Sequence, residues 1–367
     1  MSQLQPAKQP PVSVVVPTCA NAVALERAIA SILATRYEPL EVVVVENRPP
    51  ASSTRRLVEE RFAGEPVSYV EEARRGASWA RNTGLARADG DIVAFTDDDV
   101  VVDQGWIHSA VGAFEYASDV ACVTGRILPL SLDSPWQRLF EQLAVFDKGS
   151  EGRVFRLAES RAEEPLFPYV AGHVGSGGNI FVRREVALSI GGFDPALGPG
   201  TPAVGGEDLD LMVRILQGGG AIVYEPSVII KHDHPDCPKG LRRHAYRYGI
   251  GLTAMLGKQL IRGPGRRDLL RAIPRGVRYA LNPNSRKNLQ KTSDYPRSLD
   301  TLERLGMLLG PFAYVLSVAE SAARDRPWLR DVLRYRRSRV PDLNDADPNS
   351  SGDGPLPVAE RSRRQLT

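Results

Sequence analysis

Short apolar runs alternate with amphipathic segments over the first hundred residues of the chain. Runs rich in β-branched residues lie at 12–16, 41–45, 67–70 and 92–95, and helical patterns lie between them at 22–34, 54–62 and 78–88. Strands that are apolar throughout are typical of a parallel sheet that is covered on both faces. With right-handed crossovers, this order predicts an α/β fold with a doubly wound, mostly parallel central sheet.

The pattern after residue 118 is less regular. Short strands are predicted at 120–124, 179–182 and 222–224, with a polar insertion near 148–168, and residues 240–340 are mostly helical in pattern. The last residues are rich in Pro, Ser, Asp and Gly, a composition typical of disorder. We therefore predict a flexible N-terminus at 1–10, an α/β domain at 11–240 with halves at 11–117 and 118–240, a basic helical extension at 241–340, and a disordered tail at 341–367.

Composition places the chain among soluble globular proteins. It has 367 residues, of which 42% are hydrophobic and 25% charged, enough for one large domain or two smaller ones. The cysteines Cys19, Cys122 and Cys237 form neither a metal-ligand spacing nor an even disulfide set, which favours a reducing cytoplasm. The first residues do not resemble a signal peptide, and no run reaches the roughly 20 apolar residues of a membrane span.

Charge is distributed unevenly along the chain. Residues 1–230 carry 20 basic and 30 acidic residues, a net charge of −10, whereas residues 231–340 carry 24 basic and 9 acidic residues, a net charge of +15. Such a basic block suits an anionic surface, whether phospholipid, a lipid-linked phosphate or nucleic acid. A solvated helical exterior explains the charge equally well.

Three consecutive carboxylates follow a buried strand. Asp97, Asp98 and Asp99 come directly after the apolar run at 92–95. Like charges at contact distance repel, and a divalent cation such as Mg²⁺ or Mn²⁺ would relieve that cost and bind phosphate oxygens in turn. A solvated acidic turn is the alternative. The position at the carboxyl end of a strand, where open α/β sheets bind ligands, favours a site.

Further motifs follow in a definite order along the chain. They are Val14–Thr18, Glu46-Asn47, Arg75–Gly84, the acidic triplet, Gly175–Asn179, Gly191–Asp194, Gly206–Asp210 and His232–His234. The series resembles the family-two inverting glycosyltransferases with the A-type nucleotide-sugar fold, over residues 11–250. The resemblance implies an enzyme that moves a sugar from a nucleotide-diphosphate sugar to an acceptor hydroxyl and uses Mn²⁺ or Mg²⁺.

The resemblance also implies which residues hold the donor. Pro17 and Thr18 match the loop that meets the nucleoside, and Glu46 stands where the family usually has Asp to read the base or ribose. Arg75 and Arg81 match basic residues that approach the diphosphate or support the loop around it. Asp98 matches the acid that positions its neighbours, and Gly177 and Gly178 match a loop whose backbone approaches the sugar closely.

Metal and catalytic roles follow from the same match. Asp97 matches a residue that reaches the ribose or the metal. Asp99 matches the principal metal ligand. A downstream histidine that completes the metal shell matches either His232 or His234. Asp208 matches the base that deprotonates the acceptor, with Glu207 beside it, although both acids would also suit the start of a helix.

Two other functions compete with this interpretation. A nucleotidyltransferase of related fold normally has a glycine-rich, basic loop after the first strand, whereas residues 17–21 contain neither glycine nor a basic residue. A non-enzymatic membrane- or nucleic-acid-binding protein would leave the acidic motifs unexplained. The expected partners are therefore the nucleotide-sugar donor and a glycan, lipid-linked or small-molecule acceptor. A homodimer is left open, and no nucleic acid is expected.

Two apolar segments of the basic extension suggest contact with a membrane. They are Tyr248–Ile261 and the 14-residue run Gly306–Ala319, which Pro311 interrupts and which is too short for a typical span. Arginines crowd near the first segment, and apolar insertion with a basic patch is the signal for interfacial binding. We predict a cytoplasmic protein held at the inner face of the cell membrane. Packing as core helices or as a dimer interface is the alternative.

Overall fold

The computed structural model describes residues 9–19, 21–47 and 52–324. The predicted tail at 341–367, and all but the last two residues of the predicted N-terminus, lie outside these ranges. Strands β1 (Val12–Thr18), β2 (Leu40–Asn47), β3 (Val67–Glu72) and β4 (Ile92–Thr96) pair in parallel in the order β3-β2-β1-β4. These are the strands expected from the first four apolar runs.

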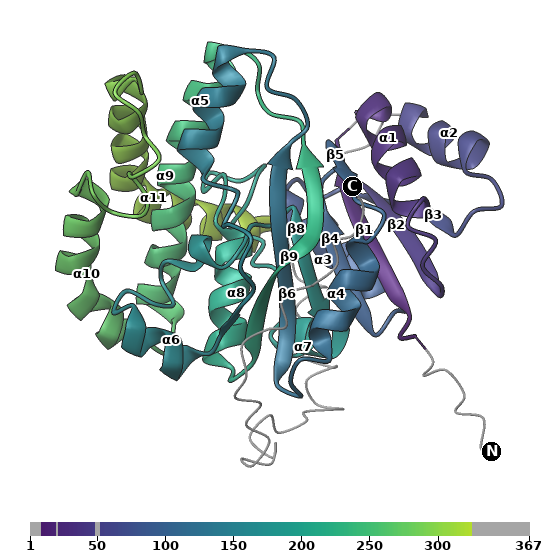
Figure 1. The fold of residues 1–367 in the computed structure, drawn as a ribbon, viewed down its shortest axis with the longest axis horizontal. Helices are drawn as coiled ribbons and strands as arrows, with labels where there is room; N and C mark the ends of the chain where they lie inside the picture. The colour runs from purple at the N-terminus through teal and green to yellow at the C-terminus, as the bar shows by residue number, and fades with distance from the viewer. Residues whose placement is uncertain (1–8, 20, 48–51, 325–367) are drawn as a thin grey trace, which may run out of the picture.

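The sheet continues with strands of mixed direction. β8 (Asn179–Arg183) runs antiparallel between β4 and β6 (Val120–Pro129), and β6 pairs in parallel with β9 (Ala221–His232). The short strands β5 (Val100–Val102) and β7 (Arg153–Phe155) pair antiparallel with β9. The predicted fold class is confirmed as a mostly parallel, mixed sheet between layers of helices, with a helical region after it (Figure 1).

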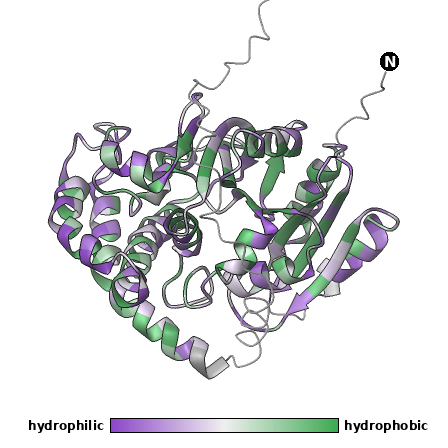
Figure 2. Ribbon diagram, turned by 90° about the horizontal axis from the view of Figure 1, so that it is seen from below, coloured by the Kyte–Doolittle hydropathy of each residue, from purple (hydrophilic) through white to green (hydrophobic). Residues whose placement is uncertain are grey.

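Helices cover both faces of the sheet because successive strand residues point to opposite sides. Val14 and Val16 belong to the core on the side of α1 (Ala22–Leu33), α2 (Ser52–Arg61) and α4 (Trp106–Phe114). Val15 belongs to the core on the side of α3 (Ala77–Arg87), α7 (Arg184–Ser189) and α8 (Glu207–Gln217). Figure 2 shows the central strands as largely hydrophobic. Burial on both faces is the physical reason that the strand sequences do not alternate.

The segment between β6 and β8 is more structured than its polar composition predicts. It contains α5 (Pro135–Ala144), β7, α6 (Leu157–Glu163) and the 3₁₀ turn η1 (Ala171–His173). A capping box starts α5, in which Ser134 and Gln137 bond each other's backbone N–H groups. This segment covers one side of the cavity described below.

Three helices form the C-terminal region, on the far side of the sheet from α1 and α2 (Figure 1). They are α9 (Pro238–Arg262), α10 (Arg266–Leu281) and α11 (Arg297–Arg324). Glycines lie where α9 and α11 touch: a Cβ added to Gly306 would overlap the carbonyl oxygen of Tyr246, and one added to Gly249 would overlap that of Glu303. The two backbones are therefore in direct contact, as small residues allow.

Helix α11 is longer than the apolar run within it. Its residues Arg297–Ser321 are long and apolar enough to cross a membrane by length and composition, and 28% of the apolar window is buried. This differs from the expectation that the run Gly306–Ala319 is too short, because the helix continues through Pro311 and through polar residues on both sides. The other segment, Tyr248–Ile261, lies in α9, where Ile250, Ala254 and Met255 are buried in the protein core.

Candidate active site

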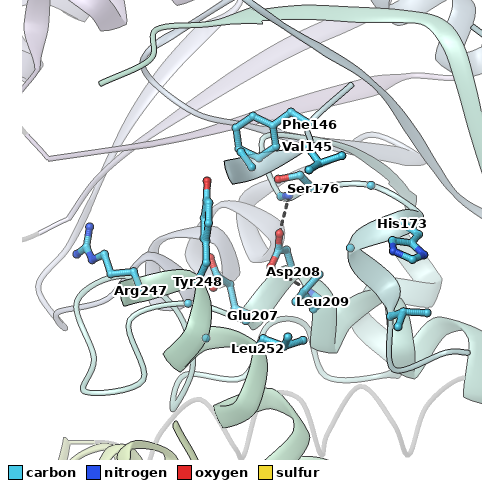
Figure 3. A pocket seen from close by; sticks show the side chains of 18 of the residues that line it. Val145, Phe146, His173, Ser176, Glu207, Asp208, Leu209, Arg247, Tyr248 and Leu252 are labelled. Atoms are coloured by element: carbon cyan, nitrogen blue, oxygen red, sulfur yellow. Dashed lines mark hydrogen bonds between the residues drawn. The ribbon is translucent and has the colours of Figure 1, made fainter. Parts of the chain in front are cut away.

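One large cavity opens beside the carboxyl ends of β1, β2 and β4. Its volume is about 1730 Å³, and it extends from the acidic triplet to the helices α9, α10 and α11. Figure 3 shows Asp208 from α8 and Tyr248 from α9 extending into the same space. Among the described residues, the structure brings nearly all the predicted site residues to this cavity: Pro17, Thr18, Arg75, Arg81, Asp97, Asp98, Asp99, Gly177, Gly178, Glu207, Asp208 and His232 line it.

The middle acid of the triplet is held by the first strand. The Thr18 hydroxyl donates a hydrogen bond to Asp98 Oδ2 at 2.6 Å. Burial raises the pKa of Asp98 to about 6, and the charges on Asp99 and Asp97 add to the effect while the Thr18 bond opposes it. Asp98 therefore joins the loop after β1 to the loop after β4.

The outer acids of the triplet form a cluster with a histidine. One oxygen each of Asp97 and Asp99 and one ring nitrogen of His232 all lie within 4.8 Å of one another. Asp99 Oδ1 is buried, and no group among the described residues hydrogen-bonds to it. Burial, followed by the charge on Asp97, raises the pKa of Asp99 to about 7. Two crowded carboxylates with an unpaired oxygen suit a hard divalent cation.

The histidine of this cluster is held in its neutral form. Burial lowers the pKa of His232, so its ring is uncharged near neutral pH. Its Nε2 lies 3.6 Å from Asp99 Oδ1, and its Nδ1 lies 3.0 Å from Nδ1 of His234. The other ring nitrogen of His234 contacts Glu141 at 2.6 Å. Of the two histidines left open by the sequence, His232 lies with the carboxylates, and His234 lies behind it as an orienting partner.

A buried arginine connects the triplet to α8. Arg81 donates from Nη1 to Glu207 Oε1 at 2.7 Å and from Nη2 to Asp97 Oδ1 at 2.9 Å. Burial disfavours its charge, but the carboxylates around it more than offset this and raise its pKa. Burial raises the pKa of Glu207 to about 7, with Arg81 opposing the effect. Arg81 is therefore a structural bridge between two acids of the site.

Asp208, which follows Glu207 in the sequence, faces the cavity. Asp208 Oδ2 accepts from the backbone N–H of Gly177, and Oδ1 accepts from its neighbour Leu209, both at 2.8 Å (Figure 3). Within the described residues, Asp208 forms no ion pair, unlike Glu207. Its position at the start of α8 also favours the carboxylate through the helix dipole. A half-buried carboxylate with free lone pairs is a competent proton acceptor.

The glycine loop is packed closely against these acids. A Cβ on Gly177 would lie 2.9 Å from Asp208 Cβ, and one on Gly178 would lie 2.8 Å from Asp97 Oδ2. The absence of side chains therefore makes room for the two carboxylates. Whether the loop also approaches a sugar stays a prediction.

Two predicted site residues, Glu46 and His234, are not among the residues that line the cavity. The Glu46 carboxylate is buried, with hydrogen bonds from the hydroxyls of Thr54, at 3.0 Å, and Tyr69. The next residue, Asn47, lines the cavity instead, and its Oδ1 accepts from Gly76 N–H at 2.9 Å. This bond holds the turn before α3, where Gly76 has a φ of 139°. The role predicted for Glu46 as a reader of the base stays untested.

Two residues of α9 reach the site without having been predicted there. Arg247 and Tyr248 line the cavity, and Figure 3 shows Tyr248 beside Glu207, with Arg247 on the other side of Tyr248. Burial, with the charges of Asp208 and Asp97, raises the pKa of Tyr248. In the sequence, Tyr248 begins the apolar segment Tyr248–Ile261, for which we predict a membrane contact, and Arg247 directly precedes it.

Comparison with known proteins agrees with this geometry. Residues 13–191 match the model of the family Glycosyl transferase family 2. Residues 13–191 are therefore similar to a family 2 glycosyltransferase domain. The matched part contains β1 to β4, the acidic triplet and the glycine loop, whereas α8 and His232 lie beyond it.

Curated relatives match the same part of the chain. It is 30% identical over 229 residues to a pre-mycofactocin glycosyltransferase of Mycobacterium tuberculosis H37Rv, covering 61% of this chain and 43% of the relative. It is 29% identical over 212 residues to a glucosyl-dolichyl phosphate glucuronosyltransferase of Haloferax volcanii, covering 56% of this chain and 62% of that relative. The chain thus spans less than two thirds of the length of either relative.

A solved structure shows the same architecture. The mannosyltransferase PcManGT from Pyrobaculum calidifontis, in complex with GDP-Man and Mn²⁺, superposes with a TM-score of 0.54 at 21% identity. The match covers 90% of this chain and 85% of the other, so it includes much of the C-terminal helical region. The protein has the A-type glycosyltransferase fold.

Proposed function

We propose that this glycosyltransferase is a metal-dependent, inverting enzyme that moves a hexosyl group from a nucleoside-diphosphate sugar to an acceptor hydroxyl. The observation that carries the proposal is the Asp97–Asp99–His232 cluster in the same cavity as Asp208. The Mn²⁺ and GDP-Man in the Pyrobaculum structure support a donor and a metal of these classes.

Inversion requires a single displacement assisted by one base. In the proposed step, the acceptor oxygen attacks the anomeric carbon, its proton passes to Asp208, and the bond from that carbon to the diphosphate breaks. The two backbone N–H groups that bond Asp208 hold its carboxylate in one orientation. Glu207 forms a salt bridge with Arg81 and helps to hold that arginine in place.

The metal would be held by Asp97, Asp99 and His232, with Mn²⁺ or Mg²⁺ as the candidates. When bound, it neutralises charge on the departing diphosphate. Arg75, which is exposed at the rim of the cavity, is placed to pair with a donor phosphate. Thr18 and Asp98 keep the loops after β1 and β4 together around the nucleotide.

A peripheral location at the inner face of the membrane is part of this proposal. Exposed apolar side chains form stripes at helical spacing on α10 and α11: Leu270, Ile273, Val277 and Leu281, and Leu305, Leu308, Leu309, Phe312, Val315 and Leu316. Exposed arginines, Arg266, Arg267, Arg271, Arg275 and Arg278, flank the first stripe. Apolar and basic groups together favour an anionic bilayer surface. A homodimer stays a prediction.

A donor screen tests the function directly. The full-length protein is incubated with a panel of nucleotide sugars, with Mn²⁺, Mg²⁺ or EDTA, and release of nucleoside diphosphate is measured. We expect slow metal-dependent hydrolysis of one donor, and an inverted anomeric configuration in the released sugar by NMR. Retention of configuration, or equal release in EDTA, would overturn the corresponding part of the proposal.

A further inference from the structure

The cavity is larger than a donor site requires and becomes apolar with distance from the acids. Small-molecule sites commonly occupy about 300–1,000 Å³, whereas this cavity has about 1730 Å³. Its section between α9, α10 and α11 is lined by Leu256, Leu260, Ile273, Val277, Met307 and Leu308. We call this section the apolar channel. A nucleotide sugar is polar along its whole length and has no use for such a lining.

The apolar channel opens on the protein surface. Ile273, Val277 and Leu308 line it and are nevertheless 42%, 53% and 72% exposed. These three residues also belong to the exposed stripes on α10 and α11. A ligand could therefore extend from the acids, through the channel, to the apolar surface of the molecule.

Three basic residues line the same cavity. Lys148 and Arg286 line the cavity, and the positive charge of Arg286 acts to lower the pKa of Lys148. The same charge acts to lower the pKa of Tyr279 on α10, so Arg286 lies near both residues. Arg247 lines the cavity nearer to Glu207. Within the described residues no salt bridge joins any of these three cations to a carboxylate, and Lys148 donates a hydrogen bond to the backbone carbonyl oxygen of Val145. Cations in a cavity that no salt bridge neutralises favour an anionic group such as a phosphate.

We propose that the acceptor is a lipid whose hydroxyl-bearing head group is joined through phosphate to a long apolar chain, and that this chain lies in the apolar channel. The inference rests on the proposed function, because it gives the acceptor of the same reaction. The acceptor hydroxyl forms the new bond to the anomeric carbon, its proton goes to Asp208, and the nucleoside diphosphate leaves. The lipid phosphate itself is not consumed.

A photolabelling experiment tests the channel without relying on transfer. The probes are a sixteen-carbon alkyl phosphate with a terminal diazirine and its four-carbon homologue, applied to the full-length protein below micellar concentration. Labelled positions are identified by mass spectrometry. We expect the long probe to label α10 and α11 at channel positions, with at least tenfold less labelling by the short probe.

Matched variants separate the channel from the surface. Val277 and Leu281 lie one turn apart on α10 and are both 53% exposed, but only Val277 lines the cavity. Val277→Asp should reduce labelling at least tenfold, whereas Leu281→Asp should preserve it. Gly276→Phe is a second plug, since a Cβ there meets no atom within 4 Å. Equal labelling in Val277→Asp, Gly276→Phe and wild type, or labelling spread evenly over Leu270 and Leu281, would overturn the proposal.

Donor hydrolysis distinguishes this inference from the proposed function. Metal-dependent release of nucleoside diphosphate should be unchanged in Val277→Asp and Gly276→Phe, which also shows that both variants fold. Absence of release from every donor in the wild type would overturn the proposed function, and this inference with it. Normal release with equal labelling in the plugged variants and wild type would overturn the lipid acceptor alone.

Discussion

Asp208 and Glu207 are neighbours in the sequence, yet they lie in different chemical environments. Glu207 is buried against Arg81, whereas Asp208 faces the cavity with backbone N–H groups as its partners. We expect Asp208→Asn to lower the transfer rate by about 10²–10⁴-fold, the usual loss of one general base, because an amide of equal size cannot accept the proton. Nucleoside-diphosphate binding in Mn²⁺, measured by calorimetry, should stay within a factor of a few of wild type.

Glu207→Gln provides the comparison for that experiment. It keeps the size of the side chain but weakens the bond to Arg81, so its main effect should be on stability. If Glu207→Gln lost more rate than Asp208→Asn at equal stability, the base would have to be reassigned.

Asp99 makes stability depend on pH in the metal-free protein. Its pKa is raised to about 7 in the folded state, above the value of about 3.9 for an unperturbed aspartate. A raised carboxyl pKa destabilises the fold once the group ionises in the unfolded chain, so the penalty is absent below about pH 4 and complete above about pH 7. Asp99→Asn should therefore be more stable than wild type at pH 8 in EDTA and about equal to it at pH 4.

Urea denaturation at these two pH values checks this prediction. Added Mn²⁺ should stabilise the wild type and leave Asp99→Asn nearly unchanged, because binding to the folded state alone raises its stability. A difference between the two proteins that does not change with pH would contradict the assignment of the buried charge.

At the scale of elements, the contact between α9 and α11 depends on glycine. A side chain on Gly306 would overlap the backbone of α9 at Tyr246, so the helices would have to separate. We expect Gly306→Leu to lower the free energy of unfolding by about 1–3 kcal/mol, as overpacking commonly does. Thermal denaturation measures the change.

Gly112 of α4 offers a matched control for a helical glycine. A Cβ at this exposed position meets no atom within 4 Å. Gly112→Ala should therefore be neutral or stabilising by up to about 1 kcal/mol, since alanine is the better helix former. Equal destabilisation by both substitutions would mean that the close approach of α9 and α11 is not what costs stability.

At the scale of the whole molecule, helices α10 and α11, which carry the exposed stripes, lie far from α1 (Figure 1). We expect the protein to float with phosphatidylglycerol vesicles at low salt and to dissociate as salt screens its arginines. Phe312→Ser with Leu316→Ser, at side chains 70% and 61% exposed, should weaken flotation several-fold.

Val23 on α1 is the control for that experiment, because it is 84% exposed but lies on the opposite side of the molecule. Val23→Ser should float like wild type. Point substitutions are preferable to removing α11, since that helix packs along α9 and its loss would expose the core. Equal binding by all three proteins would place the contact elsewhere.

The sequence by itself determined the elements of the donor half and their chemistry. Apolar runs such as 12–16 can be predicted as strands from the sequence. Both faces of such a strand are buried, so nearly every residue in the run is apolar. The acidic triplet could be found for the same reason: charges directly after a buried strand are conspicuous. The order of the motifs led to the glycosyltransferases, which the family match supports.

Only the tertiary structure decided which of these side chains meet. Asn47 could be separated from Glu46 only when β2 was placed beside the cavity, because neighbours in a strand point to opposite sides. His232 ends β9 and His234 lies just beyond the strand, so only the path of the chain there decides that His232 lies with the carboxylates. Arg247, Tyr248 and the apolar channel depend on how α9 to α11 pack on the domain. An apolar helical residue has the same pattern whether it faces a core, a bilayer or a ligand, so long-range packing decides between them.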